Sequence, residues 1–197
     1  RVADDLCVLR SMHTNVPNHE PGLLMMNSGN IQPIRPCLGS WASYGLGTGN
    51  QNLPSFVSLC PGLPVVGPQL WSNSFLPGEY QATAIDTSDM TTEKLIANIK
   101  HPSLSRSEQR KQLDLLQRLN QIHMAKRQND PALETQIKAM ELAFEMQREA
   151  SEVFDISREP DYIHKAYGNT IFSKGCLLAR RLVENGVRFV QMHYVTS

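Results

Sequence analysis

Polar side chains that could do chemistry gather directly after a short apolar run near the start of the chain. The run, residues 6–9, is bounded by charged residues and predicts a buried strand. Ligands of open parallel sheets bind at the carboxyl ends of the strands, which is where this polar stretch would lie. It could bind a metal or shuttle protons, or it could cap a turn and a short helix at residues 22–27. The side chains concerned are His13, Asn15, Asn18, His19 and Glu20.

A second candidate site lies at the expected start of the next helix. Residues 38–47 follow a proline and end in glycine, which predicts a short helix with Cys37 or Ser40 at its amino end. The positive end of a helix stabilises anions and favours a thiolate. Cys37 could therefore be a nucleophile, and Arg35 could pair with a phosphate or sulfate oxyanion. A buried cysteine packed at the helix start is the competing interpretation.

His193 is the third candidate, in the apolar run 187–195 that predicts a buried strand. It could face a site from the carboxyl end of that strand, or it could be an ordinary half-buried residue. The four cysteines lack metal-ligand spacing, and the chain has no phosphate-binding loop, dinucleotide fingerprint, His-Glu-x-x-His or nucleophile elbow. The candidates are therefore looser constellations of residues and not complete motifs.

Composition excludes several classes of partner. The chain has 197 residues, 41% hydrophobic and 19% charged, which is typical of one sizeable globular domain. Its 19 basic and 19 acidic side chains balance, so net charge does not steer it toward nucleic acid or anionic lipid. No apolar run approaches the roughly 20 residues that span a bilayer.

The elements that must position these candidates follow an α/β order. Residues 1–60 predict a βαβ-like segment, with strands at 6–9 and 53–60 around the helix at 38–47. Residues 61–104 are rich in Pro, Gly, Ser and Asn and predict an irregular excursion of the kind that carries a binding surface.

Residues 105–154 predict a hairpin of two amphipathic helices. Ser105 and Glu108 form a capping box, and Asp130 and Pro131 start the second helix. Apolar residues recur at helical spacing on one side of each helix, namely Leu115, Leu116, Leu119 and Ile122 in the first and Leu133, Ile137, Met140 and Phe144 in the second.

Residues 155–197 predict a loop, a helix at 170–184 that ends at Asn185 and Gly186, and a final strand. Together the segments predict a single α/β domain over residues 1–197. Its sheet should be mostly parallel and flanked by helices.

Six stretches of the chain, in order, resemble a bacterial family of exported proteins catalogued as domain of unknown function 1501. They are "LRSMHTNVPNHEPGLLMMNSG", "RPCLGSWASYGLGTGNQNLPSFVSLCPG", "FLPGEYQATAIDT", "QRKQLDLLQRLNQIH", "DISREP" and "LLARRLVENGVRFVQ". This family groups by fold with alkaline phosphatases and sulfatases. The resemblance implies hydrolysis of phosphate or sulfate esters, of a small molecule or a polysaccharide, with a divalent metal. It also implies export to the periplasm or the extracellular space.

The resemblance also implies roles for particular residues. The family usually reads Arg-Pro-Ser at the helix start, where this chain has Arg35, Pro36 and Cys37. Cys37 would then be the nucleophile or anion anchor, with a thiol in place of a hydroxyl. His193 matches the family's histidine after Arg-Phe-Val-Gln and is the one candidate metal ligand. One wall of the site would be lined by His13, His19, Arg35 and Cys37. The candidate residues for binding the substrate or its anion are Arg35, Ser40, His13, His19 and Asn18.

Several expected blocks are absent from the chain. Family members usually carry an aspartate-bearing motif near the amino terminus, and Trp-Asp-x-His, Gly-Glu-Phe-Gly-Arg and Arg-Asp-His blocks after the last strand. We therefore expect an internal fragment without most of its metal ligands. A truncated sheet would expose edges, which favours a homo-oligomer that covers them. The alternative function is a non-catalytic binding or structural module whose contact surface is the segment 61–91 or the helical hairpin.

Overall fold

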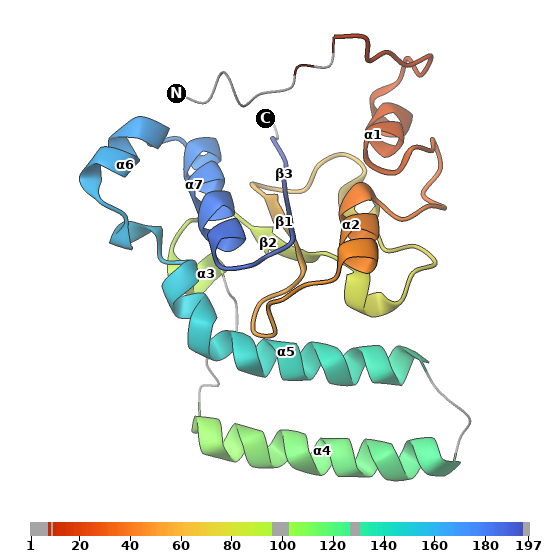
Figure 1. The fold of residues 1–197 in the computed structure, drawn as a ribbon, viewed down its shortest axis with the longest axis vertical. Coiled ribbons are helices and arrows are strands. Elements are labelled where there is room, and N and C mark those ends of the chain that lie inside the picture. Colours follow the sequence, from red (N-terminus) through yellow and green to blue (C-terminus); the bar gives the residue numbers. More distant parts are fainter. Residues whose placement is uncertain (1–7, 9, 96–102, 127–130, 195–197) are drawn as a thin grey trace.

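The apolar run at residues 53–60 forms β1 (Phe56–Cys60), the centre of a parallel sheet (Figure 1). All five residues of β1 are buried, as expected of a central strand covered on both faces. The structure is a computed structural model that describes residues 8, 10–95, 103–126 and 131–194. The strand predicted at residues 6–9 lies outside these residues except for Val8, which is exposed and belongs to no strand.

Two short strands flank β1, in the order β2-β1-β3. They are β2 (Thr83–Asp86) and β3 (Phe189–Met192), and both run parallel to β1. The prediction of a parallel sheet in a mixed α/β chain is therefore confirmed. The outer sides of β2 and β3 pair with no further strand among the described residues.

The prediction that residues 61–104 are irregular is wrong for part of that segment, because it contains β2. The same segment holds two 3-10 helices, η2 (Gly67–Trp71) and η3 (Gly78–Tyr80), and the short helix α3 (Thr92–Leu95). The strand has only four residues, and only Ile85 among them is buried. So short a strand shows no alternating pattern long enough to stand out from its Pro- and Gly-rich flanks.

Side chains that alternate along β1 enter two separate cores, one on each face of the sheet. On one face, Phe56 and Cys60 pack with α1 (His19–Ser28), α2 (Leu38–Leu46) and η2. On the other face, Val57 and Leu59 pack with residues of the helices that follow β2. Those helices and turns are α5 (Pro131–Val153), η4 (Ile156–Arg158), α6 (Asp161–Tyr167) and α7 (Ile171–Glu184). The result is a layered arrangement with helices on both faces of the sheet.

The helical hairpin forms as predicted from its capping signals. In the capping box before α4 (Arg106–Lys126), the Ser105 amide donates to the Glu108 carboxylate at 2.8 Å, and the Glu108 amide donates to the Ser105 hydroxyl at 3.4 Å. The turn at residues 127–130, including the predicted cap Asp130, lies outside the described residues. Figure 1 shows α4 as the outermost layer, separated from the sheet by α5. None of the described helices is long and apolar enough to cross a membrane.

Candidate functional site at the carboxyl edge of the sheet

The three strands bring a thiol, a carboxylate and an imidazole to one edge of the sheet. β1 ends at Cys60, which pairs with Asp86 at the end of β2. His193 directly follows β3, and its amide donates to the Leu59 carbonyl at 2.9 Å, which holds it level with the end of β1. This is the carboxyl edge, where parallel sheets bind their ligands.

His193 has a chemically unusual environment. Its ring packs on the indole of Trp71, with 5.2 Å between ring centroids, and Trp71 is itself buried. Its Nε2 atom is buried and has no hydrogen-bond partner among the described residues. Burial lowers the pKa of His193 below its ordinary value of 6.5, so the imidazole is neutral at pH 7. A neutral imidazole with an unused ring nitrogen can accept a proton or hold a ligand.

Cys60 and the residues at the end of β2 add a second unpaired group and two groups of fixed protonation at this edge. Thr87 is fully buried, its amide donates to the Cys60 carbonyl, and its hydroxyl has no partner among the described residues. Burial raises the pKa of the Cys60 thiol, so the thiol stays protonated. Hydrogen bonds from Ser88 lower the pKa of Asp86, which is therefore a carboxylate at neutral pH.

The amino end of α2 points toward the same edge. Gly47, which ends α2, accepts a hydrogen bond of 2.9 Å from Arg188, the residue before β3. The carboxyl end of α2 therefore lies at the amino edge of the sheet, and α2 runs opposite to the strands. This direction places Cys37, the N-cap of α2, on the side of His193.

Cys37 is buried in this arrangement, with 1% of its surface exposed. It belongs to the same apolar cluster as Cys60 and Trp71. Its amide donates to the Ser72 carbonyl at 3.0 Å, and its Sγ lies 3.3 Å from the hydroxyl of Ser40. The Ser40 hydroxyl in turn donates to the Tyr80 carbonyl at 2.8 Å. The thiol and the hydroxyl are therefore engaged with each other and with the backbone, and they are not open to solvent.

The other predicted site residues lie on the exterior. His13, Asn18, His19 and Arg35 are all exposed, and no hydrogen bond or ion pair among the described residues joins them to Cys37 or His193. His13 contacts only the Ser11 carbonyl, at 3.2 Å, through its Nδ1 atom. Sequence spacing thus identified α1 and α2 as the region of the candidate site, but the predicted residues of this region do not line one common surface. The structure puts Cys37 in contact with Ser40 and in the same buried cluster as Trp71, whose ring packs on His193. The four exposed residues lie outside this arrangement.

Sequence reasoning missed Cys60, Asp86, Thr87 and Trp71. Asp86 and Thr87 depend on the pairing of β1 with β2, a strand that the sequence pattern did not reveal. Trp71 depends on η2, which lies in the segment that we expected to be irregular. One signal could have found Asp86, because a carboxylate directly after the short apolar run "ATAI" fits the end of a strand.

The donor groups at this edge do not make a metal-ligand set. Among the described residues there is no group of three or more His, Cys, Asp or Glu side chains placed to hold a metal ion. Asp86 and His193 come from the two outer strands, on opposite sides of β1. The described residues therefore do not fit the divalent metal that the family resemblance implies.

The comparison with known families gives one match. The model of a family described as "Protein of unknown function (DUF1501)" matches residues 1–195. No curated protein and no solved structure matches the chain.

Proposed function

The chain belongs to the DUF1501 family of proteins of unknown function, and from this premise we propose that it acts in the hydrolysis of phosphate or sulfate esters. The proposal includes the alkaline-phosphatase and sulfatase type of fold, export from the cell and a divalent metal, for which the described residues do not supply a complete set of ligands. The resemblance supports these points. The observation that carries the proposal is the half-buried imidazole of His193 at the carboxyl edge of a parallel sheet, because its buried Nε2 atom has no hydrogen-bond partner among the described residues.

Each group at the edge has a role consistent with ester hydrolysis. Neutral His193 can take the proton of an attacking water or hydroxyl, a form of general base catalysis that contributes about 10²–10⁴-fold. The amino end of α2 stabilises the developing negative charge, with Cys37 as its anchor or as the nucleophile. Because Cys37 is buried, with 1% of its surface exposed, binding of substrate at its thiol requires the residues around it to move.

The test is a screen of aryl phosphate and aryl sulfate esters with Mg²⁺, Mn²⁺, Ca²⁺ and Zn²⁺ supplied in turn. Cys37→Ala should abolish turnover, whereas Cys37→Ser restores the residue that the family usually carries and should keep it. Because Cys37 is buried, circular dichroism must show that both variants fold. If Cys37→Ala is folded and turns over at the parent rate, Cys37 is removed from the mechanism. If neither ester class is hydrolysed with any of these metals, the proposed activity fails.

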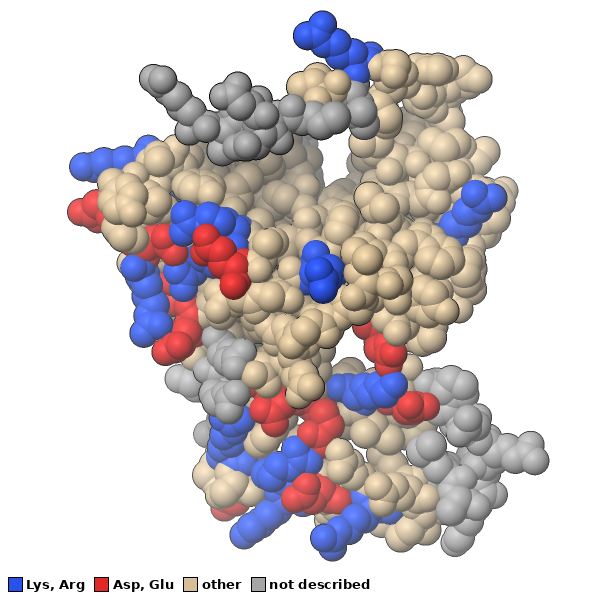
Figure 2. Space-filling model, viewed as in Figure 1, with Lys and Arg blue, Asp and Glu red and all other residues tan. Residues whose placement is uncertain are grey.

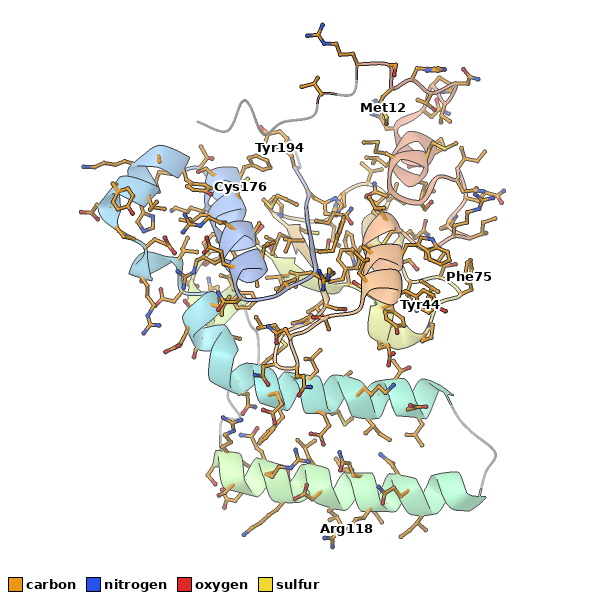
Figure 3. The ribbon with its side chains drawn as sticks, in the orientation of Figure 1. Met12, Tyr44, Phe75, Arg118, Cys176 and Tyr194 are labelled. Carbon is orange, nitrogen blue, oxygen red and sulfur yellow. The ribbon has the colours of Figure 1, made fainter. Side chains whose placement is uncertain are left out.

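An exposed cluster of aromatic rings favours the second candidate, a binding module. Trp41 and Tyr44 from α2 contact each other edge-to-face at 6.0 Å, and Trp41 contacts Phe75 at 5.8 Å. All three are exposed, and Figure 3 shows Tyr44 and Phe75 close together on one side of the molecule. Exposed Trp and Tyr side chains are enriched where proteins bind partners. The ester screen separates the candidates, because a binding module hydrolyses nothing.

A further inference from the structure

The outermost helix, α4, presents its aliphatic residues to solvent. Leu115, Leu119 and Ile122 follow one another at spacings of four and three residues, and Leu116 lies beside them. Their exposed fractions are 58%, 52%, 57% and 42%, in the order Leu115, Leu119, Ile122 and Leu116. The sequence pattern predicts an apolar face of this kind, but in a hairpin that face would normally pack on the second helix. Here it does not, and we call these four residues the α4 stripe.

The stripe is exposed because the opposite face of α4 holds α5. Arg110 forms two bonds of 2.7 Å with the Glu141 carboxylate, and Gln109 bonds Gln147 at 2.8 Å. The guanidinium groups of Arg106 and Arg110 also stack over the ring of Phe144, at 4.9 Å and 5.2 Å. The bidentate arginine–carboxylate pair and the two cation–π contacts together fix which face of α4 packs against α5. This packing turns the α4 stripe away from the rest of the protein.

Positive charge lines one edge of the stripe. Lys111 and Arg118 are two helical turns apart and therefore lie along the same edge. Neither forms an ion pair within the described residues. Figure 3 shows Arg118 on the side of α4 that faces away from α5, and Figure 2 shows charged side chains gathered over α4 and α5. The carboxylates of α4 are already engaged, Asp114 with Arg110 at 2.8 Å and Glu108 with Ser105 at 2.8 Å.

We propose that the α4 stripe is a docking surface for an acidic amphipathic helix of a protein partner. Leu115, Leu119 and Ile122 stand at positions i, i+4 and i+7. Apolar side chains at this spacing form the contact surface between two packed helices. Carboxylates beside the partner's own apolar seam would pair with Lys111 and Arg118. This inference does not depend on the proposed hydrolysis, because the stripe lies on the outermost helix and not at the edge of the sheet.

Charge argues against a second copy of the chain on this surface. Antiparallel pairing of two α4 helices would bring the Lys111 and Arg118 edges together, so like charges would meet. Parallel pairing would set that edge against the other side of the stripe, which carries Gln112 and Leu116. Neither arrangement supplies a free carboxylate.

The test uses two synthetic helical peptides, each about three heptads long with leucine along its seam. One carries glutamate beside the seam and the other carries lysine. We expect the parent protein to bind the glutamate peptide at least about tenfold more tightly than the lysine peptide. The double variant Lys111→Glu/Arg118→Glu should reverse this preference. A control with the same net charge, Arg10→Glu/Lys165→Glu, changes two exposed residues away from α4 and should keep the parent preference.

The aliphatic part of the surface is tested with Leu115→Glu and Leu119→Glu. Both side chains are already exposed, so the variants should keep the parent's circular dichroism spectrum and lose binding of the glutamate peptide. Equal binding of both peptides, or a preference unchanged by charge reversal, would overturn the proposal. So would a dimer in sedimentation velocity that Leu119→Glu abolishes, because a second copy would then cover the stripe. Binding to phosphatidylcholine–phosphatidylglycerol vesicles without peptide binding would identify a membrane surface instead.

Discussion

The carboxylate of Glu159 links the turn η4 to the helix α7. Glu159 follows η4, and its carboxylate accepts hydrogen bonds from Arg180, at 2.5 Å, and from Arg181 on α7. Only 10% of the Glu159 side chain is exposed, so both bonds form largely out of water. Arg181 also donates to the Val153 carbonyl at 2.8 Å, which ties the end of α5 to the same point.

Glu159→Gln should lower the free energy of unfolding by about 2 kcal/mol, because charged hydrogen bonds of this kind contribute about 1.5–3 kcal/mol each and the amide keeps only part of them. Urea unfolding measures the loss. Glu152→Gln is the matched control, because its 3.4 Å pair with Arg158 is exposed and such pairs contribute about 0–1 kcal/mol. Equal losses in the two variants would show that burial of the Glu159 pair is unimportant.

The difference between parent and Glu159→Gln should depend on pH. The two arginines lower the pKa of Glu159 below its ordinary value of 4.5, so the folded state binds this proton less readily than the unfolded chain. The stabilisation is therefore complete above pH 4.5 and disappears as the pH falls through the lowered folded pKa. Urea unfolding of parent and variant at pH 7 and at successively lower pH should give converging free energies. A constant difference would contradict the electrostatic explanation.

At the residue scale, sequence reasoning located Cys37 and His193 but not their surroundings. The helix start at residue 38 follows from local signals, proline before it and glycine after it. That Cys37 and Trp71 belong to one buried cluster depends on packing between segments more than 30 residues apart, which no local pattern encodes. Thr87 and Asp86 were missed for the same reason, because their positions depend on the non-local pairing of β2 with β1.

The helix α2 packs so closely on β1 that only a glycine fits at one point of contact. A methyl group on Gly39 would lie 2.4 Å from the ring of Phe56, closer than any real contact. Gly45, in the same helix, has open space where its side chain would be. The two glycines therefore form a matched pair.

Gly39→Ala should destabilise the protein by about 1–3 kcal/mol, because overpacking moves the Phe56 ring or separates α2 from β1. Gly45→Ala should instead stabilise it by about 0.5–1 kcal/mol, because alanine loses less backbone entropy in a helix. Thermal or urea unfolding of both variants compares the two effects. If Gly39→Ala is as stable as Gly45→Ala, α2 does not pack on β1 at this distance.

At the element scale, the helices and strands that local sequence signals specify agree with the prediction. Both helices of the hairpin, α2, β1 and β3 follow from capping residues, periodicity or a continuous apolar run. The direction in which α4 faces was not predictable in this way. Periodicity identifies an apolar face, but it does not say that Arg110, Glu141 and Phe144 will fix the opposite face on α5.

At the scale of the whole molecule, the α/β order of the segments predicted a mixed fold with a parallel sheet, which the structure confirms. The order of strands depends on β2, which sequence analysis missed, so the composition of the carboxyl edge could not be foreseen. The outer sides of β2 and β3 remain unpaired among the described residues, and the homo-oligomer stays a prediction.

The most direct test of the account is the effect of His193→Gln on the hydrolysis of whichever ester the screen identifies. Glutamine keeps a polar side chain but cannot take a proton, so kcat/KM should fall by about 10²-fold or more while the fold is kept. His164→Gln on α6 is the control and should leave kcat/KM unchanged. A folded His193→Gln variant with the parent's kcat/KM would contradict the claim that catalysis occurs at the carboxyl edge of the sheet.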